Sequence, residues 1–331
     1  MRIRQTMMHL LLCAGLVAMT GCGLGLFDER QGGSDQLPTQ AVGPYGKPPI
    51  DFDTPADEPF VLSDRSASLW NPAAVWREGG GFRIWYGREE VDGVAGESDI
   101  WMFGLASITE LPDEVETPVL SADASWEQNR VASPSILDRG NGHLIMFYEG
   151  GIANPAIGRA DSMDGGATWQ KHASNPLLTE AFAPGLGELE GAWYLFYESS
   201  SRLGVFLADS SDGVSWTSRP DPVITARPQL RDAFDNFAVS APFPIIERTA
   251  GGQLHFGLFF NGEDVDGDVT IGYAGSLDGE VWESFSTEDP VVDAGAPYEF
   301  GPTVLRTPSR GVMFFSEARQ GRQRISVATH P

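Results

Sequence analysis

The sequence is poor in lysine, in cysteine and in positive charge. Lys47 and Lys171 are the two lysines among 331 residues, and 22 basic side chains stand against 46 acidic ones, which gives a net charge of −24. Because this charge repels a phosphate backbone, nucleic acid is excluded as an expected partner. Two cysteines exclude a disulfide framework and a cysteine zinc site. Hydrophobic residues make up 41% of the chain, which is enough for a full core and excludes a disordered acidic protein.

Long hydrophobic runs are also scarce, and the run near the N-terminus is too short to remain as a membrane-spanning helix. It covers residues 7–19, follows two arginines and ends in the tetrapeptide Met-Thr-Gly-Cys at 19–22. This order resembles a bacterial lipoprotein signal, which implies cleavage before Cys22 and lipidation of that residue. An ordinary secretory signal that contains a cysteine is the alternative.

These observations divide the chain into three expected parts. Residues 1–21 form the lipoprotein signal peptide, residues 22–57 carry the lipidated cysteine and a flexible tether, and residues 58–331 form the folded domain. The tether is predicted because residues 23–57 are rich in glycine, proline, aspartate and glutamine and lack apolar periodicity. We therefore expect a protein of the bacterial cell envelope that contacts the membrane only through its lipid. Gly23, standing where an aspartate would resemble an inner-membrane retention signal, favours the outer membrane.

Internal repeats are the main signal in the folded part. A small or polar residue followed by proline recurs five times, with the prolines 62, 50, 58 and 60 residues apart. The five copies are Asn71-Pro72, Ser133-Pro134, Ala183-Pro184, Ala241-Pro242 and Gly301-Pro302. Each copy is followed by a polar turn and an aromatic strand. Proline is permitted at the start of a strand because its missing N–H need not pair there.

Two further repeats complete the pattern. Ser-x-Asp-Gly turns that end on tryptophan occur at 162–169, 210–216 and 276–282, and Asp-Gly is typical of a hairpin turn. A proline followed by short apolar residues occurs five times, once before the first inner strand and never after the last. This order predicts an all-β, five-bladed β-propeller with four antiparallel strands per blade, its last blade closed by an N-terminal strand. A β-sandwich with coincidental turns is the alternative.

The repeats, over residues 58–331, resemble the five-bladed propellers of glycoside hydrolase families 43, 32 and 130, the arabinanase, levansucrase and invertase group. The resemblance implies an active site in the axial funnel, where the inner strands begin. It also implies acids beside the blade-starting prolines, since glycoside chemistry needs one carboxylic acid and one carboxylate. Here the pre-proline residues are Asn, Ser, Ala, Ala and Gly, so the catalytic residues of these families are not carried over.

Other side chains near the expected funnel are therefore the candidates. We expect a non-standard catalytic set of Glu149, Glu198 and Asp235, although an acidic protein carries many such residues in its loops. The expected substrate-binding residues, which would stack on sugar rings or bind sugar hydroxyls and carboxylates, are Trp70, Asn71, Arg88, Arg130 and Glu299. Packing between blades is the alternative role for the tryptophan, and surface ion pairing is the alternative for the arginines.

The expected function is that of a carbohydrate-active propeller, which binds glycans and, if active, is a hydrolase or phosphorylase. A catalytically inactive propeller that binds glycans or a protein partner is the alternative. We expect a monomer that needs no cofactor. A weak calcium candidate is the aspartate series Asp264, Asp266 and Asp268, which departs from the EF-hand pattern at Val269 and Gly275.

Overall fold

The computed structural model describes residue 52 and the chain from residue 60 to 330, except for residues 64–65, 78–79, 111, 113, 250, 285–289, 293–297, 308–309 and 320–321. The predicted signal peptide, Cys22 and almost all of the predicted tether lie outside the described residues. Within them, no helix is long and apolar enough to span a membrane.

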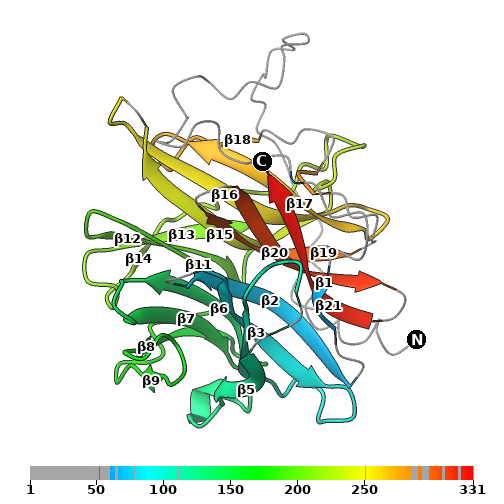
Figure 1. The fold of residues 1–331 in the computed structure, drawn as a ribbon. Helices are drawn as coiled ribbons and strands as arrows, with labels where there is room; N and C mark the ends of the chain where they lie inside the picture. Colours follow the sequence, from blue (N-terminus) through cyan, green and yellow to red (C-terminus); the bar gives the residue numbers. More distant parts are fainter. Residues whose placement is uncertain are drawn as a thin grey trace.

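The described residues form five antiparallel sheets, here called blades 1 to 5 (Figure 1). Blade 1 contains β2 (Ala67–Trp76), β3 (Phe82–Glu90), β4 (Asp99–Leu105) and β5 (Glu114–Leu120). Blade 2 contains β6 (Val131–Asp138), β7 (Leu144–Gly150), β8 (Ala156–Ser162), β9 (Gln170–Lys171) and β10 (Leu178–Thr179). A short 3-10 helix, η1 (Ser125–Glu127), precedes blade 2.

The remaining blades follow in chain order. Blade 3 contains β11 (Ala181–Leu189), β12 (Ala192–Ser199), β13 (Val205–Ser210) and β14 (Thr217–Ser218). Blade 4 contains β15 (Ala238–Arg248), β16 (Leu254–Glu263), β17 (Val269–Ser276) and β18 (Glu283–Ser284). Blade 5 contains β19 (Glu299–Arg306), β20 (Gly311–Arg319), β21 (Arg322–His330) and β1 (Phe60–Ser63), which pairs antiparallel with β21.

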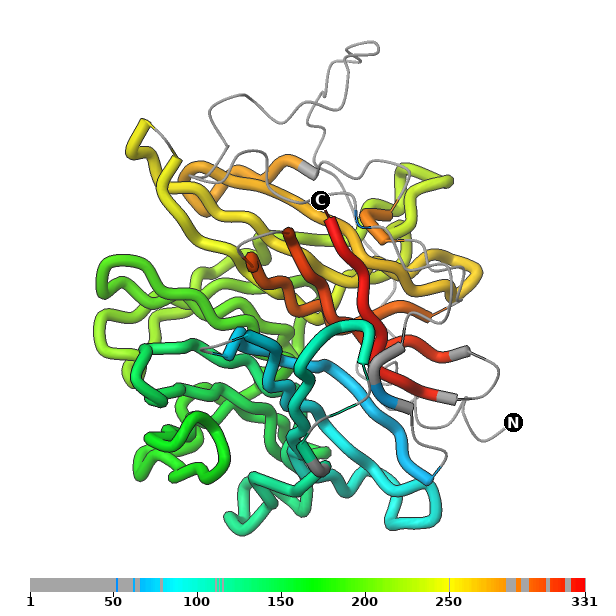
Figure 2. The backbone as a smooth tube through the Cα atoms, viewed as in Figure 1, coloured from blue at the N-terminus to red at the C-terminus, as the bar shows by residue number. Residues whose placement is uncertain are grey.

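The predicted five-bladed all-β propeller is confirmed. The first strand of each blade is the inner one, and the inner strands contact one another in the ring order β2, β6, β11, β15, β19 and back to β2. Figure 2 shows the chain passing from blade 1 in blue and cyan to blade 5 in red, which lies beside blade 1. The expectation of four strands in every blade is wrong for blade 2, because β9 and β10 both pair with β8.

The Ser-x-Asp-Gly turns are architectural. In each turn the aspartate accepts hydrogen bonds from the preceding serine hydroxyl and from backbone N–H groups, as Asp212 does from Val214 and Ser215 at 2.8 and 2.7 Å. The tryptophan that ends each turn packs edge-on against an aromatic ring of the preceding blade. These pairs are Trp169 with Trp85, Trp216 with Phe147 and Trp282 with Phe196.

Arginines repeat the same connection between blades. In each turn, the carbonyl of the glycine in Asp-Gly accepts a hydrogen bond from an arginine of the preceding blade. The pairs are Arg83 with Gly165, Arg159 with Gly213 and Arg219 with Gly279. Since each contact joins two blades, the motif that marks the repeat in the sequence also holds the ring together.

The core reaches into the segment predicted to be tether. Phe52 is 6% exposed and packs on Phe259 with ring centroids 6.0 Å apart, and its N–H donates to the carbonyl of Val291. Residue 52 therefore belongs to the packing of blades 4 and 5.

Candidate functional site

The five pre-proline residues form the inner rim of the propeller, here called the axial ring: Asn71, Ser133, Ala183, Ala241 and Gly301. Each has a positive φ between 44° and 65°. Each also stands at a β-bulge, because the pairing of inner and second strand is interrupted at this residue and the following proline. A bulge re-aims the backbone, so the N–H of the ring residue is released from its own blade.

Most of these N–H groups are bound by a side chain of the preceding blade. The acceptor comes from one equivalent position of the second strand. The pairs are Glu149 with Ala183 at 3.3 Å, Glu198 with Ala241 at 2.9 Å, Asn261 with Gly301 at 3.0 Å and Ser316 with Asn71 at 3.0 Å. A buried backbone N–H requires such an acceptor, so these side chains join neighbouring blades at the axis.

Blade 1 departs from this rule. Its equivalent position is Gly87, opposite Trp70 in the strand pairing. A Cβ on Gly87 would lie 2.1 Å from the indole Nε1 of Trp70, so the absence of a side chain makes room for the indole. Trp70 is 7% exposed and the Arg130 guanidinium covers it, 5.3 Å from the ring centroid. The predicted stacking residue is therefore covered within the protein by Arg130.

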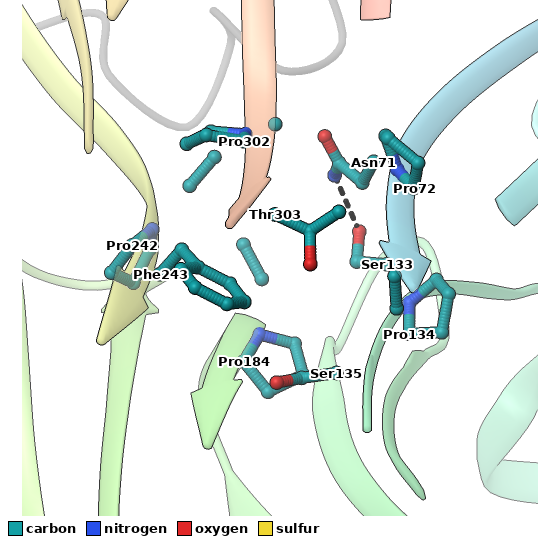
Figure 3. A pocket seen from close by; sticks show the side chains of 14 residues that line it. Asn71, Pro72, Ser133, Pro134, Ser135, Pro184, Pro242, Phe243, Pro302 and Thr303 are labelled. Atoms are coloured by element: carbon teal, nitrogen blue, oxygen red, sulfur yellow. Dashed lines mark hydrogen bonds between the residues drawn. The ribbon is translucent and has the colours of Figure 1, made fainter. Parts of the chain in front are cut away.

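The axial ring encloses a small cavity (Figure 3). Its volume is about 30 Å³, far below the roughly 300 Å³ at which ligand pockets begin. Pro72, Pro134, Pro184, Pro242 and Pro302 line it with the ring residues. A molecule the size of a sugar ring does not fit into this cavity.

Glu149 is the centre of a hydrogen-bond network at the axial ring. It is 7% exposed, and its Oε1 accepts from Arg130 Nε at 3.1 Å. Its Oε2 accepts from the Ser133 hydroxyl at 3.0 Å, and that hydroxyl accepts from Asn71 Nδ2 at 2.9 Å. The structure thus brings the predicted Asn71, Arg130 and Glu149 together with Trp70 beneath them.

Glu198 occupies the same position one blade further on. Its described hydrogen bond is the one from the Ala241 N–H to Oε1. The side chain is only partly buried by accessible surface, yet protein crowds its carboxyl group. This desolvation, together with the charge of Glu149, raises the pKa of Glu198 to about 8, against the opposing effect of the hydrogen bond from the Ala241 N–H. Glu198 is therefore a carboxylic acid at neutral pH and has a proton to donate.

The other predicted residues lie apart from this network. Asp235 precedes β15, is 1% exposed and forms an ion pair with Arg227 at 2.8 Å, while burial raises its pKa. A Cβ on Gly262, the residue after Asn261, would lie 2.7 Å from the Cβ of Asp235. Glu299 is fully buried opposite Glu317 in the pairing of β19 and β20. Neither contacts Glu149 or Glu198 in any described interaction.

Arg88 also lies apart from the network around Glu149. It directly follows Gly87, the blade-1 equivalent of Glu149, and consecutive residues of a strand point to opposite faces of the sheet. Its guanidinium stacks 4.6 Å above the ring of Trp101 and pairs with Glu90 at 2.8 Å and Glu116 at 3.3 Å. It lines a second, larger cavity in blade 1.

The calcium candidate is a compact hairpin loop. The carboxylate of Asp264 accepts backbone hydrogen bonds from Asp266 at 2.9 Å and Asp268 at 3.0 Å. Among the described residues, no group of three or more histidine, cysteine, aspartate or glutamate side chains is arranged to hold a metal ion.

Some members of the site were outside the sequence prediction. The sequence marks Ser133 only as the residue before a proline, whereas its hydroxyl bridges Asn71 and Glu149. Ser316 of blade 5 accepts the hydrogen bond from the next ring N–H, as Glu149 and Glu198 do in blades 2 and 3. The place of Ser316 in the repeat, on the strand that follows the Pro motif, is the signal that identifies it.

No sequence-family profile and no curated protein matches the chain. Solved glycoside hydrolases share its fold. One from Bacteroides ovatus is 17% identical with a TM-score of 0.66, and the match covers 89% of this chain and 95% of that one. A structure from the GH130 family of mannoside phosphorylases, which contains hydrolases of β-1,2-mannosidic linkages in Candida mannan, is 16% identical with a TM-score of 0.65 over 89% and 95%.

A more distant likeness is a mutant of the Bombyx mori GH32 β-fructofuranosidase BmSUC1 in complex with sucrose. It is 16% identical with a TM-score of 0.58, and the match covers 80% of this chain and 58% of that one. At these identities the likeness establishes the five-bladed fold of the glycoside hydrolases and leaves the reaction open.

Proposed function

We propose that this protein is an envelope-anchored, carbohydrate-active propeller that binds a glycan above the axial ring and cleaves it with Glu198 as the proton donor. The observation that carries the proposal is the placement of Glu149 and Glu198 at equivalent positions of adjacent blades, each accepting an N–H of the axial ring, with Arg130 paired to Glu149 and the pKa of Glu198 raised. Two carboxyl groups in different environments are what glycoside cleavage uses. Glu198 would protonate the leaving oxygen as its bond to the anomeric carbon breaks, and Glu149 would stabilise the positive charge that develops on the sugar. A water molecule from solvent would then add to the anomeric carbon, and its proton would restore the carboxyl group of Glu198.

The fold supports a glycan as the ligand. The similar structures are glycoside hydrolases, and one of them holds sucrose. The site itself offers hydrogen-bond donors, because the Glu198 carboxyl and the Arg130 guanidinium both face acceptor oxygens of a bound sugar. The absence of acids from the axial ring means that the chemistry would use second-strand carboxyls in place of the expected pre-proline ones.

A second candidate function is glycan binding without cleavage. It is favoured by the engagement of Glu149, whose two oxygens accept from Arg130, Ser133 and the Ala183 N–H. Because both of its oxygens are engaged by these donors, neither is free to attack a sugar or to accept a proton from water.

Turnover separates the two candidates. Soluble residues 51–331 are tested for sugar release from β-1,2-mannooligosaccharides, arabinan and sucrose, with and without phosphate. Glu198→Gln should lower kcat by about 10²–10⁴-fold, because the amide keeps the hydrogen bond and cannot donate the proton. Glu190→Gln is the matched control, since Glu190 is an exposed glutamate of blade 3 paired with Arg248. Binding without release by the wild type would establish the second candidate.

The proposal includes the anchor. We propose a signal at 1–21, a lipid on Cys22 and a tether over 22–57 that places a monomeric propeller at the outer membrane. This rests on the order of the arginines, the apolar run and the Met-Thr-Gly-Cys sequence. The tether would lead into β1, and we infer that the pairing of β1 with β21 closes the ring.

A further inference from the structure

We propose that the cavity in blade 1 is a second sugar-binding site, which takes a neutral sugar unit of the glycan that the axial face binds. The inference rests on the proposed function and adds a subsite to it. The cavity, here called the blade-1 groove, has a volume of about 370 Å³, which lies within the range of ligand pockets. Its lining includes Arg88, Glu97, Asp99, Trp101 and Asn129.

The groove opens at the same end of the propeller as the axial site. The loop at 91–98 joins the end of β3 to the start of β4, and Glu90 at the end of β3 pairs with Ala67 at the start of the inner strand β2. Ser98 bridges to Arg130, which belongs to the axial network. The backbone of Ser98, which lines the groove, therefore adjoins that of Arg130, so a glycan bound at Arg130 would have the groove beside it.

The groove contains a fixed aromatic wall. Trp101 is partly exposed, and the Arg88 guanidinium is stacked 4.6 Å from its ring centroid. Glu90 and Glu116 hold this guanidinium in place through ion pairs at 2.8 and 3.3 Å. A preorganised wall of this kind loses little conformational entropy when a sugar packs against it. The apolar C–H face of a sugar ring suits the part of the Trp101 indole that the Arg88 guanidinium leaves exposed.

The polar groups of the groove are mainly acceptors. Asp99 has no described hydrogen-bond partner, and Glu97 accepts from Asn129 Nδ2 at 2.9 Å. Carboxylates of this kind accept hydrogen bonds from the hydroxyl groups of a sugar. With Glu90, three carboxylates stand against the one positive charge of Arg88, so a uronate or sulfated unit is repelled. The charge therefore selects a neutral sugar.

The test compares glycans of different length on the full soluble domain. Binding of β-1,2-mannooligosaccharides of two to six units, arabinan oligosaccharides and sucrose is measured by calorimetry, with oligogalacturonate as the anionic probe. Asp99→Ala and Trp101→Ala should each raise the Kd of the longest bound oligosaccharide at least tenfold and leave the shortest bound ligand unchanged. Asp232→Ala, which removes an exposed carboxylate from the loop before β15, should change neither value. Trp101 also packs on the core. If Trp101→Ala unfolds for that reason, the Kd of Asp99→Ala alone decides the test.

Each outcome has a distinct meaning. An unchanged Kd of the long oligosaccharide in Asp99→Ala, or tighter binding of oligogalacturonate than of neutral chains, overturns the groove and leaves the proposed function intact. Length-dependent loss in Asp99→Ala together with no sugar release by the wild type supports the groove and overturns the proposed cleavage. A wild-type domain that binds none of the probes overturns both.

Discussion

At the scale of single residues, the site is defined by what one strand position carries in each blade. In blades 2 to 5 the side chain at this position accepts a hydrogen bond from a backbone N–H of the next blade, and these residues are Glu149, Glu198, Asn261 and Ser316. In blade 1 the residue is Gly87, whose missing side chain makes room for Trp70. Glu149 and Glu198 share this role but differ in their surroundings. An arginine stands beside Glu149, whereas burial keeps Glu198 protonated.

The raised pKa of Glu198 predicts a pH dependence of stability. The unfolded chain ionises this residue near its ordinary pKa of about 4.3, whereas the folded protein does so only at about 8. The folded protein binds the extra proton between these values, so this group makes stability fall as pH rises through that window. Glu198→Gln should therefore raise the melting temperature at pH 9 and leave it nearly unchanged at pH 4. Equal shifts at both pH values would contradict the assignment.

Gly301 predicts a second effect, on the contact between blades 5 and 1. Its φ is +65°, and a Cβ would lie 2.2 Å from Asn71 Oδ1. Gly301→Ala should reduce the free energy of unfolding by about 3 kcal/mol, from backbone strain and the clash together. Gly191→Ala is the control, because Gly191 has a φ of +87° with no atom within 4 Å and should lose roughly 1 kcal/mol.

Chemical denaturation measures both variants. If the clash is the larger part, adding Asn71→Ala to Gly301→Ala should restore some of the lost stability. Equal losses in Gly301→Ala and Gly191→Ala would show that the packing against Asn71 is unimportant.

The sequence predicted the position of a site residue where the repeat fixes that position. It did not predict a hydrogen bond whose partner lies in another blade. The spacing after each Pro motif placed Glu149 and Glu198 at the axis. Their acceptor role depends on the N–H groups of Ala183 and Ala241, which the bulges release. Nothing in the local sequence of Arg88 indicates that its side chain points away from Arg130, because this depends on strand register.

At the scale of elements, the Ser-x-Asp-Gly turns are the connectors between blades. Hydrogen bonds from the side chain and the N–H of Thr168 hold the pKa of Asp164 at about 2, so the turn keeps its charged form over the whole physiological range. The sequence predicted these turns because Asp-Gly and Trp are local signals. It did not predict the division of the outer part of blade 2 into β9 and β10, since two-residue strands carry no periodicity.

Trp216→Ala tests the turns as connectors. Its ring packs edge-on against Phe147 of blade 2 with centroids 5.6 Å apart, so truncation removes a contact between blades 2 and 3. The expected loss is about 2–4 kcal/mol of unfolding free energy. Met163→Ala, in the turn of blade 2 and 73% exposed, should change it by less than about 0.5 kcal/mol. Similar losses of unfolding free energy in the two variants would show that the turns do not connect the blades.

At the scale of the whole molecule, the propeller is a ring of five blades in which blade 5 contacts blade 1. The order of the repeats predicted five blades, because units of near-equal length with one displaced strand fit few other arrangements. The participation of Phe52 was not predictable, since a single aromatic residue in a polar segment has no pattern.

The anchor is tested by Cys22→Ser. A serine cannot accept the thioether-linked lipid, so the variant should move from the membrane fraction to the soluble fraction of the cells that express it. Fractionation and immunoblotting of wild type and variant measure this change. A wild-type protein that is already soluble would contradict the lipid anchor and favour an ordinary secretory signal.

The central claim is that the propeller keeps a proton donor at its axial face although its ring carries no acid. The direct measurement is a titration of the glutamate carboxyl carbons by ¹³C NMR on residues 51–331, with Glu198→Gln to assign the signal. The account predicts that the Glu198 signal titrates at a pKa of about 8. Titration at about 4.3, the ordinary value for glutamate, would contradict it and leave glycan binding without this acid.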